Sequence, residues 1–532
     1  MLAQLPARAA CRRIGRRSSA RRAFLTLPDM YRSVISSDLA GVDVDRVAKA
    51  AIPLQDLRRD DFALVRQAIG QARVVLMGEE THGTEEFYQL RSDLTKALIE
   101  REGFTAVLCE ADFPAFYELN RFVGGAPPFR DLHKQMSEKE GPTIEQAMEK
   151  LKARFPVWMW RNHVLKGLAE WMRQHNAGRP AGSRPVMLLG LDIYSMFDSA
   201  HEVIAYLDQV DTDLGNMARR QYGALGTFRP EAADYCRAIY TGKIASQAPQ
   251  VARMLATLYE NRMKCLDVPG DGDEYFAALQ NARVVGEAEE YYRNSYMGGN
   301  VTWNIRDSAM VKMIAETLAF QEDKGEGRPA RVLVWAHNSH VGDAMATEHH
   351  EQRQHNIGRL VRQQFGYDDS FIIGFSTYTG TVRAARQWNG KDFVMDLNES
   401  LPLSAGALLH RAGQRAKTND FAVLTRTNDR EHPLSDEQQA ARDALCAERL
   451  ERFVGVQYIK RTERQSHYAY CRMGEQFDLI IHVDTTSAVK PWFPKPTTTS
   501  SPRPGTIDYS RFENFEESAG SDDEVPSSGA YP

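Results

Sequence analysis

The sequence lacks the long apolar run that a membrane-spanning helix needs. Mean hydropathy is -0.47, and no stretch of about 18 consecutive apolar residues, the length that crosses a bilayer, is present. Cysteine is scarce, with six residues in 532 and no Cys-x-x-Cys pair. This scatter argues against a disulfide scaffold or a zinc ribbon and favours a reducing compartment. We therefore expect a chain that does not enter a membrane.

An excess of positive charge is also absent. The chain has 66 Lys and Arg against 71 Asp and Glu, a formal net charge of -5, so composition gives no reason to expect nucleic-acid binding. Gly-x-Ser-x-Gly, His-Glu-x-x-His and a phosphate loop ending in Gly-Lys-Ser/Thr are missing too. A serine nucleophile of the usual α/β kind is thus disfavoured, and water is a better candidate for the nucleophile.

The two ends differ in composition from the middle. Residues 1–28 hold seven arginines and no acid, as a mitochondrial transit peptide does; the alternative is an upstream start codon before a true start at Met30. From about residue 496 the chain turns to Ser, Pro and acids, which predicts a disordered tail to residue 532. We expect a leader over 1–33 and a folded domain over 34–495. The expected location is the cytoplasm, or the mitochondrion if the leader is a transit peptide.

Short apolar runs bounded by charges or turns predict the strands. Several are apolar at consecutive positions, which favours strands covered on both faces of a parallel sheet. Residues 84–102 predict a helix capped by Gly103, joining two parallel strands. The segment near 195–325 predicts a long helical insertion. We therefore expect an α/β fold with a central, mostly parallel sheet and a helical insertion that forms one wall of a cleft. The expected strands are Arg73–Met77, Thr105–Cys109, Val186–Leu189, Arg331–Trp335, Phe371–Gly374, Phe421–Leu424, Phe453–Tyr458 and Phe477–His482.

Residue types that carry catalysis follow the ends of these strands. Residues 78–83 read Gly-Glu-Glu-Thr-His-Gly and contain Glu79 and His82. Glu110 follows the second strand, and His337 follows the strand that ends at Trp335. Ligands of open parallel sheets bind beyond the carboxyl ends of the strands, so neighbouring strands would bring these side chains together. A single such residue is more often an ordinary loop residue, but several on one edge indicate a site.

The chemistry of such a cluster is coherent. A histidine with an ordinary pKa near 6.5 can accept a proton from water at neutral pH. A neighbouring carboxylate orients the ring and stabilises its charged form, and an arginine can stabilise a developing oxyanion. Arg91, on the helix after Gly83, and Arg306 are candidates for that last role. The simpler interpretation of either arginine is a structural ion pair.

These residues resemble the erythromycin esterase family. The resemblance begins in residues 78–83 and continues through Phe87-Tyr88, Arg91 and Glu110-Ala111-Asp112. The resemblance covers roughly residues 50–492, and the matching blocks occur in the same order as in the family. Later blocks are Gly190-Leu191-Asp192-Ile193-Tyr194-Ser195, Asn304-Ile305-Arg306-Asp307, Trp335-Ala336-His337-Asn338-Ser339-His340, Phe375-Ser376-Thr377-Tyr378 and Glu463-Arg464-Gln465-Ser466-His467-Tyr468.

The resemblance implies hydrolysis of an ester or a macrolide lactone without a serine nucleophile, a cofactor or a metal. It implies that His82 is the general base, that Glu79 and Glu110 orient the histidine or the water, and that His337 binds or polarises the substrate. A second set would bind substrate: Arg91, Arg306, Asp192 and Asn304. The family includes relatives not known to open macrolides, so the resemblance supports the site more strongly than the substrate.

Two other interpretations stay open. Two histidines and two glutamates would also suit a divalent metal, which would make the protein a metallo-hydrolase. Alternatively, the chain binds a small molecule without turning it over. An aromatic group would suit a large ligand in an apolar cleft, although such residues more often belong to the core. The aromatic group is Trp158, Trp160, Tyr291, Tyr292 and Trp303.

Overall fold

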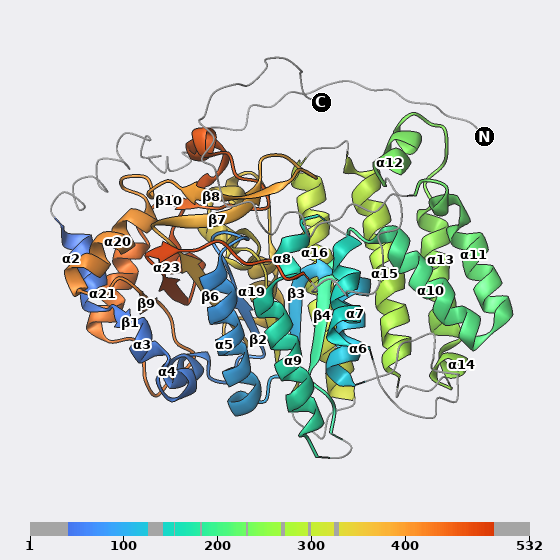
Figure 1. The fold of residues 1–532 in the computed structure, drawn as a ribbon, viewed down its shortest axis with the longest axis horizontal. Coiled ribbons are helices and arrows are strands. Elements are labelled where there is room, and N and C mark those ends of the chain that lie inside the picture. The colour runs from blue at the N-terminus through green and yellow to red at the C-terminus, as the bar shows by residue number, and fades with distance from the viewer. Residues whose placement is uncertain are drawn as a thin grey trace, which may run out of the picture. The chain divides into compact units, whose positions relative to one another are not determined.

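In a computed structural model of the chain, an eight-stranded sheet forms the centre of an α/β fold (Figure 1). The structure describes residues 41–125, 142–153, 155–180, 183–229, 232–267, 272–295, 299–323 and 329–493. The Arg-rich start and the Ser/Pro-rich end lie outside these ranges, and the domain limits 34–495 stay a prediction. Within these ranges no helix has the length and apolar character to span a bilayer.

Six neighbouring strands of the sheet are parallel, as expected for strands that are apolar at consecutive positions. They run from β12 through β6, β2, β5 and β3 to β4, while β9 and β1 extend the β12 edge in antiparallel pairing. All four residues of β2 are buried because helices cover both faces. In sheet order the strands are β1 (Ile52–Pro53), β9 (Phe421–Leu424), β12 (Leu479–His482), β6 (Ser370–Ser376), β2 (Val74–Met77), β5 (Val332–Trp335), β3 (Ala106–Asp112) and β4 (Met187–Asp192).

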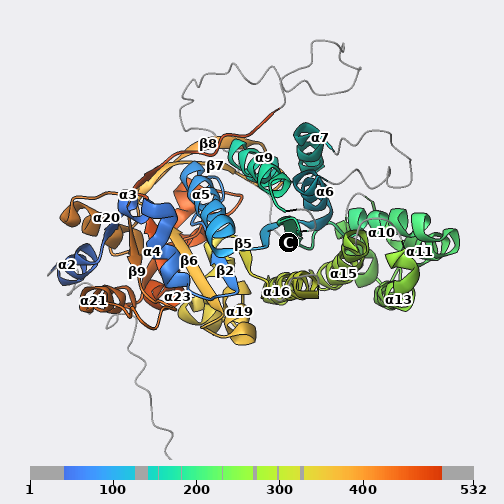
Figure 2. The ribbon, with the colours of Figure 1, turned by 90° about the horizontal axis from the view of Figure 1, so that it is seen from below.

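Helices pack on both faces of the sheet. Figure 2 shows α4, α5 and α9 on one face and α16 (Gly299–Asp323), α19 and α23 on the other. The apolar stripe predicted for residues 84–102 is buried in α5, and Gly103 ends that helix in the left-handed region at φ 70°. These helices are α2 (Val42–Lys49), α3 (Leu54–Leu57), α4 (Arg59–Ile69), α5 (Glu85–Glu102), α6 (Phe113–Gly124), α7 (Ile144–Glu149), α8 (Val157–Trp160), α9 (His163–Ala177), α19 (Ile357–Phe365), α20 (Ala405–Ala416), α21 (Asp436–Leu445) and α23 (Met473–Gln476).

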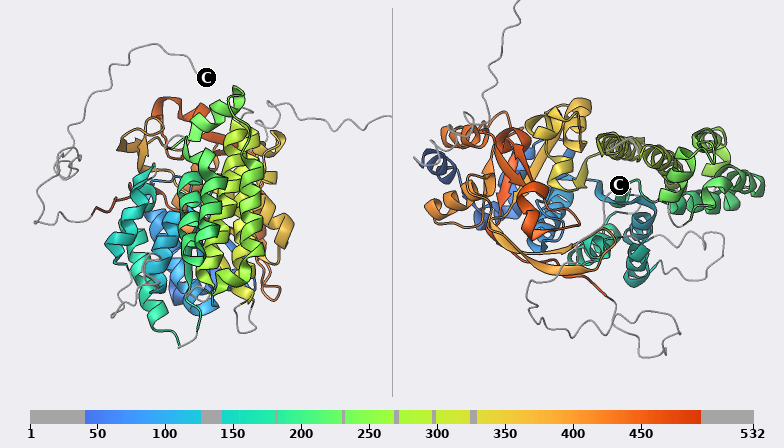
Figure 3. Two further views of the ribbon diagram at one scale, coloured as in Figure 1. Left: turned by 90° about the vertical axis from the view of Figure 1, so that its right-hand side faces the viewer. Right: turned by 90° about the horizontal axis from the view of Figure 1, so that it is seen from above.

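Between β4 and β5 all the regular elements that the structure describes are helices. Helices α10 to α15 share an apolar core of their own, which includes Val203, Met254 and Val285, and Figure 3 shows several of them standing side by side. The last helix of the segment, α16, contacts β4 and α19 and so joins this group to the sheet. The helices are α10 (Met196–Val210), α11 (Thr212–Gly226), α12 (Ala232–Tyr240), α13 (Ala248–Glu260), α14 (Arg262–Leu266), α15 (Asp273–Arg293) and α16 (Gly299–Asp323).

One expected strand is wrong. Residues 453–458 form no ladder; they lie in the connection between β10 (Arg449–Arg452) and β11 (Tyr468–Cys471), which pair with each other in antiparallel fashion. Val454 and Gln457 instead make single bridges to Thr81 and Ala385. Their backbone groups are thus satisfied by two different neighbours, which replaces a regular ladder.

A hairpin that the sequence did not predict lies beside this segment. Strands β7 (Thr379–Ala385) and β8 (Asp392–Leu397) are antiparallel, and β13 (Thr485–Thr486) pairs with β7. Three of the six residues of β8 are exposed and one, Leu397, is buried, so β8 lacks the continuous burial of the strands in the main sheet. In Figure 1 the hairpin lies above the main sheet.

Candidate active site

The order of strands in the sheet brings the predicted residues together. Strand β5 lies between β2 and β3 and is parallel to both. Glu79 and His82 follow β2, Glu110 lies near the end of β3, and His337 follows β5. The prediction that these three strands are close and parallel is confirmed, and their residues occupy one edge of the sheet.

The loop that carries His82 is fixed by its neighbours on several sides. The backbone N–H of Val454 donates to the Glu80 carbonyl at 2.9 Å, and the His82 N–H donates to the Val454 carbonyl at 3.0 Å. Buried Arg452 donates to the Glu80 carboxyl at 2.9 Å. Burial raises the pKa of Glu80 to about 7, against the opposing charge of Arg452. The loop is therefore held as a rigid platform for the histidine.

His82 forms a dyad with Glu79 and keeps one ring nitrogen open. Its Nδ1 lies 2.8 Å from a Glu79 carboxylate oxygen, which can only accept, so Nδ1 carries the proton. Among the described residues no partner is recorded for Nε2, and His82 lines a cleft. The other Glu79 oxygen accepts from Arg91. The open Nε2 is thus a proton acceptor that faces the cleft.

Arg91 does not reach the cleft, and the expectation that it points there is wrong. Its side chain is fully buried, with Cζ 4.7 Å from the Tyr88 ring centroid and 4.8 Å from that of Trp335. Glu79 is fully buried as well and is not part of the cleft wall. The ion pair therefore supports His82 from behind.

Asn304 also faces away from the cleft. Its side chain accepts from the backbone N–H of His355 at 3.0 Å and donates to the Arg353 carbonyl at 3.0 Å. These contacts hold a loop against the start of α16. A substrate in the cleft would not touch Asn304, in contrast to what the sequence led us to expect.

His337 lines the cleft, but both of its ring nitrogens are engaged. Nε2 lies 3.0 Å from the Glu80 carbonyl and must donate, while Nδ1 lies 2.8 Å from the Ser339 hydroxyl and caps the short helix α17 (Asn338–Val341). Burial lowers the pKa of His337 well below its ordinary value, and a positive charge on His82 lowers it further whenever that ring is protonated. The ring of His337 is therefore neutral, with its centroid 4.7 Å from that of His82.

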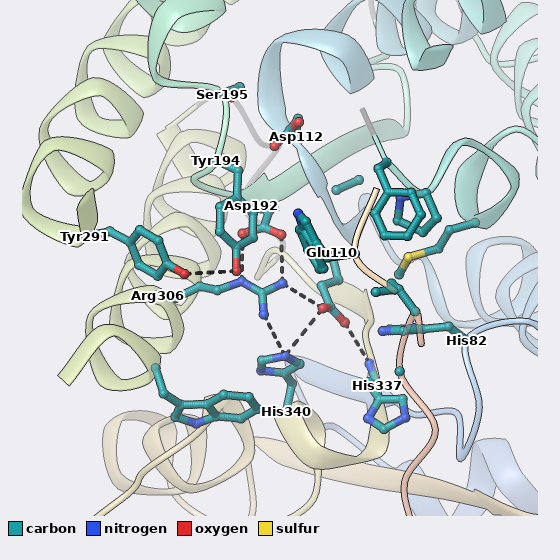
Figure 4. Close-up of a pocket in the computed structure, with 18 of the residues that line it drawn as sticks. His82, Glu110, Asp112, Asp192, Tyr194, Ser195, Tyr291, Arg306, His337 and His340 are labelled. Carbon is teal, nitrogen blue, oxygen red and sulfur yellow. Dashed lines mark hydrogen bonds and ion pairs between the residues drawn. The ribbon is translucent and has the colours of Figure 1, made fainter. Parts of the chain in front are cut away.

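Arg306 forms the centre of a charged group beside the two histidines (Figure 4). It donates to Asp192 at 2.9 and 2.8 Å and to Glu110 at 2.7 Å. The second Glu110 oxygen accepts from the His337 backbone N–H at 3.0 Å. Burial alone would raise the pKa of Glu110, but the charges of His340 and Arg306 hold it well below its ordinary value. Glu110 is thus ionised and fixed between the two sides of the site.

Sequence reasoning missed a fifth member of the site, His340. Its Nδ1 lies 2.9 Å from Asp307, its Nε2 lies 3.0 Å from an Arg306 nitrogen, and its ring stacks on Trp303 at 4.4 Å. Burial lowers the pKa of His340, but the carboxylates of Asp307 and Glu110 outweigh it and the net shift is upward. A signal was present, because Asp307 directly follows Arg306 and His340 lies three residues after His337.

The cleft has a volume of about 1630 Å³, larger than the ~300–1,000 Å³ of drug-sized pockets. The strand ends form one wall, and residues of α10, α15 and α16 form another. Four of the five aromatic residues selected from the sequence line it; Trp158 does not. The four are Trp160, Tyr291, Tyr292 and Trp303.

The side chains offer little to a metal ion. Both Glu110 oxygens and both His337 nitrogens already have protein partners. Among the residues that the structure describes, no three His, Cys, Asp or Glu side chains are grouped so as to hold a metal. His82 Nε2 alone is a single ligand, which is fewer than catalytic metal sites use.

Comparison with known proteins shows similarity to the erythromycin esterases. A model of the erythromycin esterase family matches residues 99–486. Erythromycin esterase type II from Escherichia coli is 29% identical over 345 residues, 61% of this chain and 74% of that protein. Erythromycin esterase type I from Escherichia coli is 20% identical over 446 residues, 76% of this chain and 99% of that protein.

Solved structures share the fold. A succinoglycan biosynthesis protein superposes with a TM-score of 0.62 at 19% identity, covering 85% of this chain and 98% of that one. A mutant of the erythromycin esterase EreC in its open conformation superposes with a TM-score of 0.55 at 16% identity, covering 83% and 98%. The family match spans most of the chain and includes Glu110, Arg306, His337 and His340, although Glu79 and His82 precede it. The chain belongs to the erythromycin esterase family.

Proposed function

We propose that the protein hydrolyses an ester or lactone bond of a bulky small molecule, with His82 as the general base that activates water. The observation that carries this proposal is the Glu79–His82 dyad, whose protonated Nδ1 leaves Nε2 open to the cleft. Membership of the erythromycin esterase family supports a hydrolase of this kind.

The reaction follows from the positions of the protons. Nε2 of His82 removes a proton from water, whose oxygen attacks the carbonyl carbon, and the Glu79 carboxylate stabilises the imidazolium. Four Arg306 N–H groups have partners, which leaves one N–H at Nη1 for the developing oxyanion. When the C–O bond breaks, the imidazolium returns its proton to the leaving alkoxide. The products are an acid and an alcohol, joined in one chain if the substrate is a lactone.

A macrolide lactone is the substrate class that the site suits best. The cleft exceeds the size that a small ester needs, and aromatic rings from five helices (α6, α8, α10, α15 and α16) line it. Two relatives carry the name erythromycin esterase. Their sequences are distant from this one, so the test has to include simpler lactones and esters as well.

A serine–histidine pair in the same cleft provides a covalent alternative. The Ser339 hydroxyl lies 2.8 Å from His337 Nδ1, the geometry of an activated nucleophile. The lowered pKa of His337 makes it a weak base, however, and the Ser339 backbone N–H also points at Nδ1 at 3.3 Å. We therefore expect Ser339→Ala to keep its rate within about threefold, whereas a general base is worth on the order of 10² or more. A loss of that size, with an acyl adduct on Ser339 by mass spectrometry, would favour the covalent route.

The proposed function is tested by an activity screen of the purified protein against macrolides, simple lactones and aryl esters. Product acid is measured before and after prolonged treatment with a strong chelator, with elemental analysis of the same samples. The proposal expects turnover that the chelator leaves unchanged. Activity that is lost and returns with zinc or manganese would favour a metallo-hydrolase, and ligand binding without turnover would favour a binding protein.

A further inference from the structure

An aromatic pair, exposed Trp388 and half-buried Phe155, lines the cleft outside the charged centre. Trp388 is 54% exposed although it is a large apolar side chain. Its ring meets that of Phe155 edge-on at 5.2 Å between centroids, and both residues line the same cleft as His82. A tryptophan that stays largely in water beside a cleft is well suited to bind the apolar face of a ligand.

The hairpin of β7 and β8 keeps Trp388 within a limited reach of the His82 loop. The Arg383 N–H donates to the Gly83 carbonyl at 3.1 Å, which ties β7 to the residue after His82. From Arg383 to Trp388 is five residues, at most about 16 Å of extended chain. The turn that follows, with Asn389 at φ 59°, places the ring at the tip of the hairpin.

Phe155 is tied to the opposite side of the site. It precedes the short helix α8, and the indole N–H of Trp160 in that helix donates to the Glu110 carbonyl at 3.0 Å. Each half of the aromatic pair is therefore anchored by a hydrogen bond close to a residue of the active site. The pair is positioned before a ligand arrives, which lowers the entropy cost of binding.

We propose that Trp388 and Phe155 form an outer subsite that binds the apolar ring face of a bulky substrate while its ester bond lies at His82. This inference rests on the proposed function and adds a determinant of size: substrates that reach across the cleft gain affinity, and small esters do not. Because the subsite contacts a part of the substrate that does not react, its binding energy is the same in the ground state and the transition state. Loss of the subsite should therefore raise KM and leave kcat unchanged.

The test compares Trp388→Ala and Trp388→Phe with Phe393→Ala, an exposed aromatic on β8 that does not line the cleft. For a macrolide lactone we expect Trp388→Ala to raise KM about tenfold with kcat unchanged, and Trp388→Phe to retain most of the affinity. For p-nitrophenyl acetate all three variants should match the wild type. Equal effects on both substrates, or no change in the macrolide KM, would overturn the subsite.

Calorimetry separates this inference from the proposed function. If the wild type turns over neither substrate, the proposed function fails, but macrolide binding that weakens in Trp388→Ala and not in Phe393→Ala still supports the subsite. A wild type that does not bind the macrolide overturns the subsite, whereas the proposed function is then decided by the simple lactones and aryl esters of the activity screen.

Discussion

At the scale of single residues, the two histidines at the sheet edge differ in which nitrogens are open. His82 and His337 follow neighbouring strands and look alike in the sequence, and both were expected to act in catalysis. The structure separates them: the partners of His337 are the Glu80 carbonyl and Ser339, whereas His82 keeps Nε2 open to the cleft. The Glu80 carbonyl lies 257 positions from His337 in the chain, so this contact leaves no local sequence signal and the two roles could not be told apart from the sequence.

Glu79 should affect both the rate and the stability. Glu79→Gln keeps the shape of the side chain but removes the charge that stabilises the imidazolium, so we expect kcat to fall on the order of 10²–10⁴-fold. The variant also leaves the buried charge of Arg91 unpaired, which should lower the free energy of unfolding by about 3–5 kcal/mol. Steady-state kinetics and urea unfolding measure the two effects.

A double variant separates these two effects. Glu79→Gln with Arg91→Met removes the unpaired charge and should recover much of the stability without recovering the rate. If the double variant returned to within tenfold of the wild-type kcat, Glu79 would be shown to act on stability alone.

At the scale of secondary structure, the sequence predicted strands well where both faces are buried. Runs such as Val74–Met77 and Val332–Trp335 are apolar throughout, so their place in a parallel sheet could be read directly. The β7–β8 hairpin was missed because only one of the six residues of β8 is buried. Residues 453–458 were expected to form a strand because they are rich in apolar residues, but Val454 and Tyr458 pack against the hairpin without forming a ladder. An apolar run indicates that its residues are buried. It does not show that they pair with a neighbouring strand.

Gly83 is the point where the catalytic loop meets this hairpin. A Cβ on Gly83 would collide with the backbone carbonyl of Arg383. We expect Gly83→Ala to displace the His82 loop, lowering stability by about 1–3 kcal/mol and kcat by more than tenfold. Gly167→Ala is the control, because that glycine lies in α9 with no atom near its added Cβ.

The control should gain up to about 1 kcal/mol of stability from helix propensity and keep full activity. Thermal unfolding and kcat measured on both variants provide the comparison. Wild-type kcat in Gly83→Ala would show that contact with the hairpin does not position the loop.

At the scale of the whole molecule, the site is assembled from distant parts of the chain. Glu110 and its partner Arg306 are separated by 196 positions, and the helical segment between β4 and β5 carries Arg306 back to the sheet edge. The expected helical wall and the meeting of β2, β3 and β5 followed from strand and helix patterns. The direction in which the Arg91 and Asn304 side chains face could not be predicted in this way. A helix pattern shows which face of the helix is buried, but it does not show which part of the molecule that face packs against.

A buried carboxyl beneath the site should make global stability depend on pH. Burial raises the pKa of Glu451 to about 8, from 4.5, and Asn338 donates to it at 3.2 Å. Between pH 4.5 and 8 the folded state therefore holds a proton that the unfolded state has released. Stability contributed by this proton is complete at low pH and is lost as the pH rises to about 8, by at most about 1.4 kcal/mol per unit.

Glu451→Gln should flatten this dependence, since its side chain does not titrate. Urea unfolding at pH 5, 6.5 and 8 gives the slope for the wild type, for Glu451→Gln and for Glu431→Gln, which alters an exposed carboxyl. Glu431→Gln should keep the wild-type dependence of stability on pH. An unchanged slope in Glu451→Gln would show that this carboxyl is already ionised in the folded protein.

The central claim is that His82 removes a proton from water, and one rate comparison tests it most directly. kcat for the best substrate of the screen is measured for the wild type, for His82→Ala and for His201→Ala, a histidine elsewhere on the cleft wall whose side chain is 48% exposed. With the fold intact by circular dichroism, His82→Ala should lose at least about 10²-fold in kcat while His201→Ala stays near the wild type. A His82→Ala variant that keeps more than about a tenth of the wild-type kcat would contradict the account.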